Sequence, residues 1–230
     1  MLALENLEIV QGSFRLAADM QLKPNQTTAI LGPSGGGKST LLTALAGFIE
    51  HSGDIHWQGE SLRGLAPAKR PISMLFQEHN LFPHLSVAQN VGLGLRPDLK
   101  LSGEDQAKVE AALSRVGLAG KGAELPRRLS GGQRQRVALA RALLRQKPIW
   151  LLDEPFAALG PGLRLEMLEL VEEMRAEQGA TLLLVTHAPE DAKHIAAAVV
   201  FVGAGQAYAP VPTTAFFAKP SKELRAYLGK

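Results

Sequence analysis

One short stretch holds the residues best suited to chemistry. It consists of Gly32, Pro33, Ser34, Gly35, Gly36, Gly37, Lys38, Ser39 and Thr40. This fits the G-x-x-x-x-G-K-[ST] pattern of the phosphate-binding P-loop, in which glycines turn N–H groups inward and a following helix adds unpaired amides. We expect the lysine to reach the β- and γ-phosphates of a nucleoside triphosphate, the serine to bind Mg²⁺ and the threonine to assist at the α-phosphate.

Two adjacent carboxylates, Asp153 and Glu154, follow the apolar run 149–152. Such a run predicts a strand buried on both faces, and open α/β sheets bind ligands at the carboxyl ends of their strands. We assign Asp153 to the Mg²⁺ shell beside Ser39, and Glu154 to orienting or deprotonating the attacking water. Alone, the acids could be solvent-facing helix caps and the glycines an ordinary turn. Together they favour a nucleotide site.

A second helix start has the composition of an anion site. It contains Leu129, Ser130, Gly131, Gly132 and Gln133. The serine is a good N-cap, the two glycines expose amides, and the glutamine adds a polar side chain. An ordinary capped helix is the alternative, and composition does not exclude it. The sequence thus predicts two phosphate cradles in one chain.

The elements that position these motifs alternate between strands and helices. Apolar runs and alternating patterns predict strands at residues 2–11, 14–22, 28–31, 53–58, 72–76, 149–153, 181–186, 199–202 and 206–209. Helical spacing predicts helices after the P-loop and at residues 86–95, 103–116, 131–145 and 163–178. We predict an α/β fold with a mixed, largely parallel sheet, an N-terminal antiparallel β region and an inserted α-helical subdomain. Residues 1–230 form one domain, with a nucleotide-binding core (1–78 and 147–230) and a helical subdomain (79–146).

Composition narrows the class of protein. The chain has 230 residues, 46% of them hydrophobic and 20% charged, as in a globular domain that buries a full core. Its net charge of only +3 gives no nucleic-acid footprint, and the lack of cysteine excludes disulfides and thiolate metal sites. Neither a signal peptide nor a long apolar run is found. We expect a cytoplasmic protein whose membrane role comes through a partner.

Five stretches, in order and spacing, resemble the motifs of ABC-transporter ATPase subunits. They are residues 32–40 (Walker A), Gln77 (Q-loop), residues 129–133 (signature), residues 151–155 (Walker B) and Thr186-His187 (switch histidine). The resemblance covers nearly the whole chain. It implies a P-loop NTPase (RecA-like) fold that hydrolyses ATP with Mg²⁺.

The resemblance also implies roles for matching residues. Two copies of the chain would assemble head to tail, with ATP between the P-loop of one copy and residues 130–133 of the other. Gln77 would contact Mg²⁺ or the lytic water and sense the membrane partner. His187 would contact the γ-phosphate, which places it with Glu154 and Gln77 in the catalytic set.

Two positions depart from the family's pattern. The D-loop usually carries an aspartate where this chain has Gly160, and the change removes a carboxylate expected to communicate across the dimer. Family members usually stack an aromatic residue of the N-terminal hairpin on adenine, but residues 11–13 are Gln-Gly-Ser here. Phe14 is the nearest aromatic residue, and it either stacks on the base or belongs to the core.

The segment 70–101 resembles the ATPases of bacterial importers, and within them it is most similar to those of thiamine importers. The implied partners are transmembrane permease subunits and, indirectly, a periplasmic solute-binding protein. The apolar residues Leu81, Phe82 and Leu85 suit a groove that receives a short helix from a membrane subunit, and packing in the core is an equally good interpretation of each. The implied location is the cytoplasmic face of the bacterial inner membrane. Import of another small solute (polyamine, iron or molybdate) remains an alternative, and so does a soluble ABC ATPase acting on nucleic acid or ribosomes.

Overall fold

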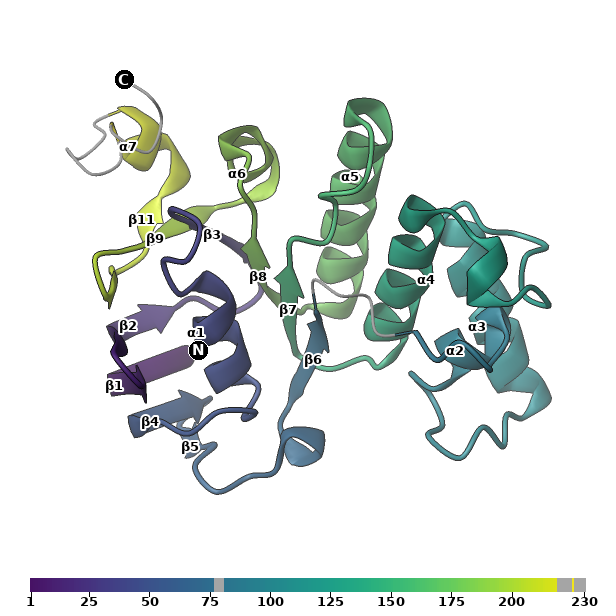
Figure 1. Ribbon diagram of the computed structural model, residues 1–230, viewed down its shortest axis with the longest axis horizontal. Coiled ribbons are helices and arrows are strands. Elements are labelled where there is room, and N and C mark those ends of the chain that lie inside the picture. Colours follow the sequence, from purple (N-terminus) through teal and green to yellow (C-terminus); the bar gives the residue numbers. More distant parts are fainter. Residues whose placement is uncertain (77–80, 219–224, 226–230) are drawn as a thin grey trace.

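The computed structural model describes residues 1–76, 81–218 and 225 (Figure 1). The predicted role of Gln77 therefore falls outside the described residues. Among them, one sheet of eleven strands has the order β5-β4-β1-β2-β10-β9-β3-β8-β7-β6, and β11 pairs with β9. The strands are β1 (Leu2–Gln11), β2 (Phe14–Leu22), β3 (Thr27–Leu31), β4 (Ser52–Trp57), β5 (Glu60–Ser61), β6 (Ile72–Leu75), β7 (Ile149–Asp153), β8 (Thr181–Val185), β9 (Ala198–Gly203), β10 (Gln206–Ala207) and β11 (Val211–Pro212).

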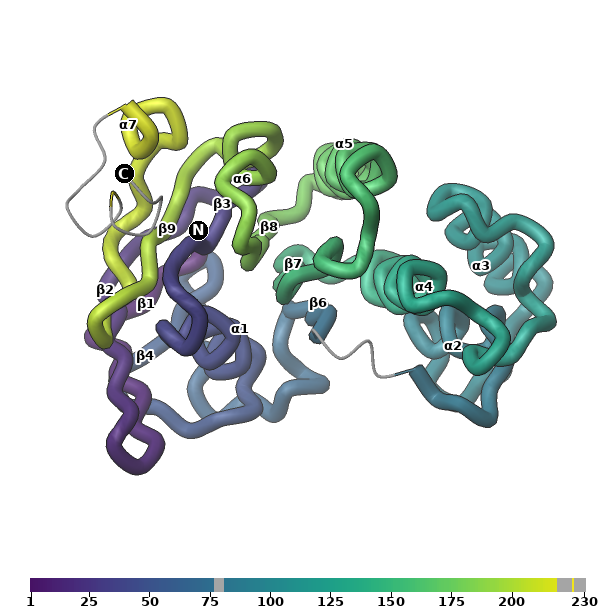
Figure 2. The backbone as a smooth tube through the Cα atoms, turned by 45° about the horizontal axis from the view of Figure 1, so that its top comes forward, coloured from purple at the N-terminus to yellow at the C-terminus, as the bar shows by residue number. Residues whose placement is uncertain are grey.

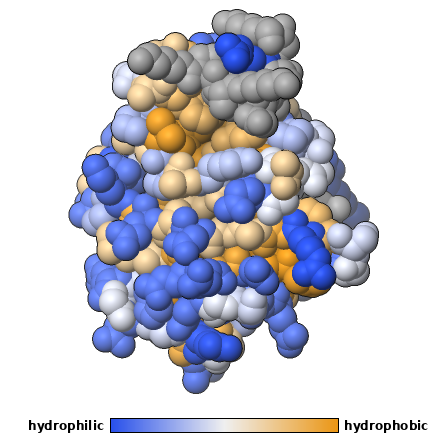
Figure 3. All heavy atoms as spheres, turned by 90° about the vertical axis from the view of Figure 1, so that its left-hand side faces the viewer, coloured by the Kyte–Doolittle hydropathy of each residue, from blue (hydrophilic) through white to orange (hydrophobic). Residues whose placement is uncertain are grey.

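The N-terminal strands form the antiparallel side of the sheet. β1 pairs antiparallel with both β2 and β4, so the predicted hairpin is present with its predicted bounds. Burial alternates along β1, where Leu7 and Ile9 are buried and Glu8 between them is exposed. Figure 3 views the molecule from this side, and hydrophilic side chains dominate the lower half of the face. This sheet is therefore packed on one face and solvated on the other.

The other side of the sheet is parallel. β9, β3, β8, β7 and β6 are neighbours in this order, and all four pairings are parallel. Every residue of β3, β7 and β8 is buried, as their continuous apolar sequences predict. Because β8 lies between β3 and β7, the chain beyond β8 emerges between the P-loop, which follows β3, and Glu154, which follows β7. The topology thus collects three predicted motifs at one edge.

The helices divide into two groups in Figures 1 and 2. Around the sheet lie α1 (Lys38–Leu45), α5 (Pro161–Gln178), α6 (Pro189–Ile195) and α7 (Thr213–Ala218), with a 3₁₀ turn at Pro67–Lys69. Gathered together beyond β6 and α5 are α2 (Val87–Gly92), α3 (Gly103–Arg115) and α4 (Gly131–Leu144), with a 3₁₀ turn at Pro126–Arg128. This second group has an apolar core of its own, which includes Val91, Leu113 and Val137.

Some element bounds differ from the prediction. Helix α2 ends at Gly92 rather than at residue 95, because the chain then packs closely on α4: a Cβ added to Gly94 would lie 2.4 Å from the carbonyl oxygen of Arg141. Helix α5 begins two residues early, at Pro161, since proline suits the first helical position. The two-residue strands β5 and β11 were not predicted, because so short a run carries no periodic signal.

Candidate functional site

The P-loop connects β3 to α1, and close backbone contacts require two of its glycines. Gly32 has φ +153°, and a Cβ added to it would lie 1.9 Å from the carbonyl oxygen of Val202 on β9. Gly37 has φ +103°, and its added Cβ would lie 2.8 Å from Cζ of Phe14. The loop is therefore seated between β9 and the N-terminal hairpin, and its amides at the start of α1 are left for a ligand.

Lys38, the first residue of α1, reaches back across the loop. Its ammonium nitrogen Nζ donates hydrogen bonds to the carbonyl oxygens of Gly32, at 3.0 Å, and Pro33, at 2.9 Å. Burial lowers the pKa of this lysine, and the nearby carboxylates of Glu154 and Asp153 oppose the shift. A cation surrounded by turned backbone amides is the environment that binds a polyphosphate.

A cleft of about 310 Å³ joins the P-loop to residues from two other strand ends. It is lined by Ser34, Gly35, Gly37, Lys38, Ser39, Thr40, Glu154 and His187. The lining thus combines the predicted phosphate cradle with the predicted water-activating carboxylate and switch histidine. Their meeting follows from the neighbouring positions of β3, β8 and β7 in the sheet.

Asp153 lies beside Ser39, with which it is predicted to hold Mg²⁺. Its side chain is buried, and its Oδ1 atom has no hydrogen-bond partner among the described residues. Burial raises the pKa of this carboxyl, and the Ser39 hydrogen bond opposes the shift. A buried carboxylate oxygen without a partner next to a hydroxyl fits Mg²⁺, which takes one or two protein oxygens together with substrate phosphates and water.

Replacing Asp153 by asparagine should stabilise the ligand-free chain. Burial raises the pKa of this carboxyl in the folded chain, so the folded chain binds a proton more tightly than the unfolded chain does. The free energy of unfolding therefore falls as the pH rises through that pKa, and at pH 7 the buried charge lowers stability. The neutral amide avoids this cost. We expect the melting temperature at pH 7, in chelator, to rise by about 2–4 °C, which corresponds to about 1 kcal/mol in a chain of this size.

Calorimetry across pH checks the Asp153→Asn prediction. The difference from wild type should shrink as the pH falls, because the wild-type carboxyl is then protonated. The matched control is Asp19→Asn, which changes an exposed aspartate of β2 and should leave the melting temperature within about 1 °C, as is usual for surface changes. A lower melting temperature for Asp153→Asn at pH 7 would contradict the prediction.

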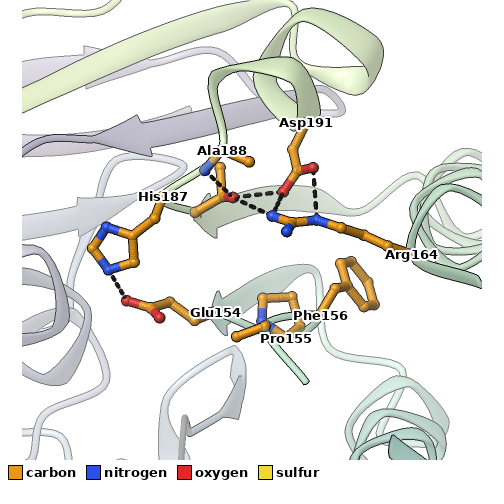
Figure 4. A pocket seen from close by; sticks show the side chains of 9 residues that line it. Glu154, Pro155, Phe156, Arg164, His187, Ala188 and Asp191 are labelled. Atoms are coloured by element: carbon orange, nitrogen blue, oxygen red, sulfur yellow. Dashed lines mark hydrogen bonds and ion pairs between the residues drawn. The ribbon is translucent and has the colours of Figure 1, made fainter. Parts of the chain in front are cut away.

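Glu154 and His187, which both line the cleft, form an ion pair (Figure 4). The distance from Nε2 of His187 to Oε1 of Glu154 is 2.5 Å, and the Glu154 side chain is 13% exposed against 42% for His187. The backbone of Glu154 has φ +49°, which is unusual for a residue with a side chain. Its carbonyl oxygen accepts a hydrogen bond of 3.3 Å from Nε2 of Gln135 on α4. The carboxylate is thus held where it faces the P-loop.

None of the residues that line the P-loop cleft, in the part of the chain that the structure describes, belongs to the stretch 130–133. That stretch begins α4, where Ser130 and Gln133 cap each other: the Ser130 amide donates to Oε1 of Gln133 at 2.9 Å, and the Gln133 amide donates to Oγ of Ser130 at 3.2 Å. Gly132 lies against the D-loop, where its added Cβ would be 2.8 Å from Cδ2 of Leu159. The predicted second cradle is therefore a capped helix start, separate from the first within one chain.

A sequence profile described as "ABC transporter" matches residues 17–157, more than half of the chain. The chain belongs to the ABC transporter family. It is an ATP-binding cassette that hydrolyses ATP, as the order of its motifs implies. No helix in the described part of this cassette is both long and apolar enough to cross a bilayer.

Individual relatives resemble the cassette over its whole length. It is 57% identical over 230 residues to the thiamine import ATP-binding protein ThiQ of Cereibacter sphaeroides, and 51% identical over 230 residues to the protein of the same name from a Ruegeria species; each alignment covers 100% of both chains. Among solved structures, the dimeric bacterial ABC transporter cassette MJ0796 superimposes with a TM-score of 0.82 at 28% identity, covering 93% of this chain and 99% of that one. The same cassette, in a dimeric post-hydrolysis state bound to ADP and phosphate, gives the same values. The predicted P-loop NTPase fold of mixed α/β type is confirmed.

In this ABC ATPase the ring of Phe14 lies against the P-loop, where it faces Gly37, and packs on the main apolar core. This is the core position that we weighed against stacking on adenine. The neighbouring residues 11–13 of the hairpin are exposed. Base stacking by Phe14 stays a prediction.

Three polar side chains next to the ion pair were not predicted. Gln135 is buried on α4, Arg164 lies on the first turn of α5, and Asp191 is buried on α6. Gln135 carried a signal, because it falls at the helical spacing of the apolar positions 138, 139 and 142. Arg164 and Asp191 carried none, since a charged residue in the first turn of a helix is ordinary.

Gly160 of the ABC ATPase D-loop is the N-cap residue of α5, and a side chain would be accommodated there. Its φ is −65°, no atom lies within 4 Å of an added Cβ, and the helix has no side-chain cap. We expect Gly160→Asp to cap α5, adding a few tenths of a kcal/mol to stability. It should also raise ATP turnover of the assembled transporter, by restoring the family's carboxylate.

Steady-state ATPase assays on assembled transporter test Gly160→Asp. The matched control is Gly162→Asp, which adds the same charge to the same helix start, also in open space. Turnover should rise by about twofold or more, on the order of 0.4 kcal/mol in the barrier, in Gly160→Asp alone. Unchanged or lower turnover, or an equal rise in both variants, would count against a D-loop carboxylate role.

Proposed function

We propose that the chain couples ATP hydrolysis to the uptake of thiamine or its phosphates, as the ATP-binding subunit of a bacterial importer. The observation that carries hydrolysis is the cleft shared by the P-loop, Glu154 and His187. The observation that carries the solute is 57% identity, over all of both chains, to a protein named for thiamine import. Import of another small solute is less well supported, since the similar relatives carry the thiamine name.

The contacts support a division of roles within one chain. Lys38 would move its two hydrogen bonds from loop carbonyls to the β- and γ-phosphates. Ser39 and Asp153 would hold Mg²⁺, which supplies positive charge at the transferred phosphate when bound. Glu154 would accept hydrogen bonding from the attacking water and take its proton, while His187 orients that carboxylate and reaches toward the γ-phosphate.

We propose that a second copy of the chain completes the site. Within one chain the capped start of α4, residues 130–133, lies outside the P-loop cleft, although it has the composition of an anion site. A head-to-tail dimer would bring these residues of one copy over the ATP of the other. The dimeric solved cassette with TM-score 0.82 supports this assembly. Gln77 would then link the site to the membrane partner.

A groove of about 580 Å³ is the proposed contact with transmembrane permease subunits. It is lined by Met74, Phe76, Phe82, Leu93, Gly94, Leu95, Pro97, Arg141, Ala142, Arg145 and Lys147. Phe82 is 46% exposed there, whereas Leu81 packs against two apolar cores. We therefore assign the permease contact to Phe82 rather than to Leu81. The chain would bind peripherally at the cytoplasmic face of the inner membrane, meet the solute-binding protein only indirectly and bind no nucleic acid.

Phe82→Ala should weaken permease binding without lowering the stability of the chain. An exposed aromatic ring at an interface typically contributes about 2 kcal/mol, so we expect about a 30-fold loss of affinity for detergent-solubilised permease. The control is Tyr208→Ala, which removes another exposed aromatic ring, at 43%, far along the sheet beyond β10. Equal permease affinity for wild type and Phe82→Ala would contradict the groove assignment.

Thiamine uptake by cells tests the proposed function. In cells whose only copy carries Glu154→Gln, uptake of labelled thiamine should fall to background, while Glu169→Gln cells should take it up normally. Glu169 is a fair control because it is also paired with a histidine, His194, but on the exposed side of α5. Thiamine uptake at the wild-type rate in Glu154→Gln cells would overturn the thiamine assignment.

A further inference from the structure

A second cavity, also about 310 Å³, shares Glu154 and His187 with the P-loop cleft, but its lining among the described residues contains none of the P-loop. Figure 4 shows its polar wall, where Arg164 meets Asp191; Thr186 joins them through its hydroxyl. Nε of Arg164 donates to Oδ1 of Asp191 at 2.9 Å, and its Nη2 donates to both Oδ2 of Asp191 and the Thr186 hydroxyl. Residues from the first turn of α5, the end of β8 and α6 thus form one network.

The Thr186 hydroxyl is the centre of this network. It donates to Oδ2 of Asp191 at 2.5 Å, and it accepts from Nη2 of Arg164 at 3.1 Å and from the backbone amide of Ala188 at 3.1 Å. One donor and two acceptor positions are all that a hydroxyl offers. Both Thr186 and Asp191 are nearly fully buried, at 3% and 5% exposure. The hydroxyl is therefore saturated and its rotamer fixed.

The network fixes the backbone on both sides of His187. Thr186 precedes it, and Ala188, whose amide bonds the Thr186 hydroxyl, follows it. The carbonyl oxygen of Ala188 in turn accepts from the Asp191 amide at 3.1 Å. A serine or threonine hydroxyl that binds the amide two residues on holds a tight turn. The ring of His187 projects from this turn toward Glu154, while its own side chain is 42% exposed.

We infer that Thr186, held by Asp191 and Arg164, is a positioning residue for hydrolysis that acts through His187. The network fixes the turn from which the histidine contacts the Glu154 carboxylate. It also connects this turn to Arg164 on the first turn of α5. The Arg164 amide donates to the carbonyl oxygen of the D-loop residue Gly160, four positions earlier, at 2.9 Å. The inference rests on the proposed roles of Glu154 and His187 in hydrolysis.

A purely structural role is the alternative, in which the Arg164–Asp191 pair only fastens α5 to α6. Substitutions that remove or keep the Thr186 hydroxyl distinguish the two roles. Thr186→Val keeps the shape of the side chain and leaves the Arg164–Asp191 ion pair in place, but it frees the turn around His187. Thr186→Ser keeps the hydroxyl. A structural role predicts activity that follows stability, and a positioning role predicts activity that follows the hydroxyl.

The chain offers a matched control on the same strand. Thr181 begins β8, is fully buried, and its hydroxyl accepts a hydrogen bond of 3.0 Å from the amide of Asn25. Thr181→Val therefore removes a buried threonine hydroxyl and leaves a backbone amide without its partner, as Thr186→Val does. It does so at the end of β8 opposite to the cleft.

Steady-state ATPase assays and thermal melts of the full chain, assembled with its permease, test the inference. We expect Thr186→Val to lower kcat about tenfold with KM for ATP within about twofold, since a small misplacement near the reacting groups lowers the rate and not binding. Thr186→Ser and Thr181→Val should keep kcat within about twofold of wild type. The melting temperature of Thr181→Val should be comparable to that of Thr186→Val, because both lose a buried hydroxyl. Wild-type kcat in Thr186→Val, or an equal loss in Thr181→Val, would overturn the inference.

Two further variants separate this inference from the proposed roles on which it rests. If His187→Ala and Glu154→Gln leave kcat unchanged, the proposed catalytic roles fail and the inference fails with them. If both lower kcat at least tenfold while Thr186→Val does not, only the positioning role is overturned.

Discussion

Replacing Glu154 by glutamine is expected to lower kcat for ATP hydrolysis by about 10²- to 10⁴-fold, the usual contribution of a positioned general base. The amide has nearly the shape of the carboxylate but cannot take a proton. Glu154 lines the cleft and pairs with His187, whereas the Lys38 ammonium lies within the P-loop, where it donates to the carbonyl oxygens of Gly32 and Pro33. ATP affinity should therefore stay within about threefold, because phosphate binding depends on the P-loop rather than on Glu154.

Steady-state hydrolysis and equilibrium binding of a fluorescent ATP analogue measure the two quantities for Glu154→Gln. Glu169→Gln is the matched control, since its exposed carboxylate also lies near a histidine, with Oε1 3.2 Å from Nε2 of His194. It should hydrolyse ATP at the wild-type rate. A Glu154→Gln chain that keeps more than about a tenth of wild-type kcat would remove Glu154 from the role of general base.

Replacing Lys38 by methionine is expected to weaken ATP binding by about 30- to 150-fold. Hydrogen bonds to a charged group contribute about 2–3 kcal/mol, and methionine keeps the length of the side chain without the ammonium. The fold should persist, because the lysine is buried and its pKa is lowered by that burial, so that its charge is not a net source of stability.

Isothermal titration with ATP and a thermal melt together test the Lys38→Met prediction. Lys108→Met is the control, because Lys108 is an exposed lysine on α3 that pairs with Glu104 at 2.7 Å. It should bind ATP as wild type does. Wild-type ATP affinity in a folded Lys38→Met chain would show that the loop amides bind the phosphates without the lysine.

Much of the fold followed from short-range patterns. The continuous apolar sequence of β7 predicted both its burial and the position of Asp153 at its end, because a strand buried on two faces needs apolar residues throughout. The P-loop was equally predictable, since its glycines meet steric demands that few other sequences meet: Gly32 approaches the backbone of β9 too closely for any side chain. These features depend on residue types within one segment.

Other features depend on contacts between distant segments and carry no local signal. The end of α2 is set by the close approach of Gly94 to α4, more than forty residues along the chain. The network around Thr186 joins Arg164 to Asp191, and neither residue stands out from the charged faces of α5 and α6. Patterning identifies which residues are buried, but it does not identify the partners of a buried charge.

The hydrogen bonds of Lys38 have a kinetic consequence. The ammonium already bridges the carbonyl oxygens of Gly32 and Pro33, and Gly32 and Gly37 lie close against β9 and the hairpin. The loop is thus preorganised, and most of the conformational entropy of ordering it is lost during folding rather than on nucleotide capture. Association of ATP with one subunit should then be a single diffusive step, and in the proposed dimer the slow phases of the catalytic cycle should come from the meeting of two subunits.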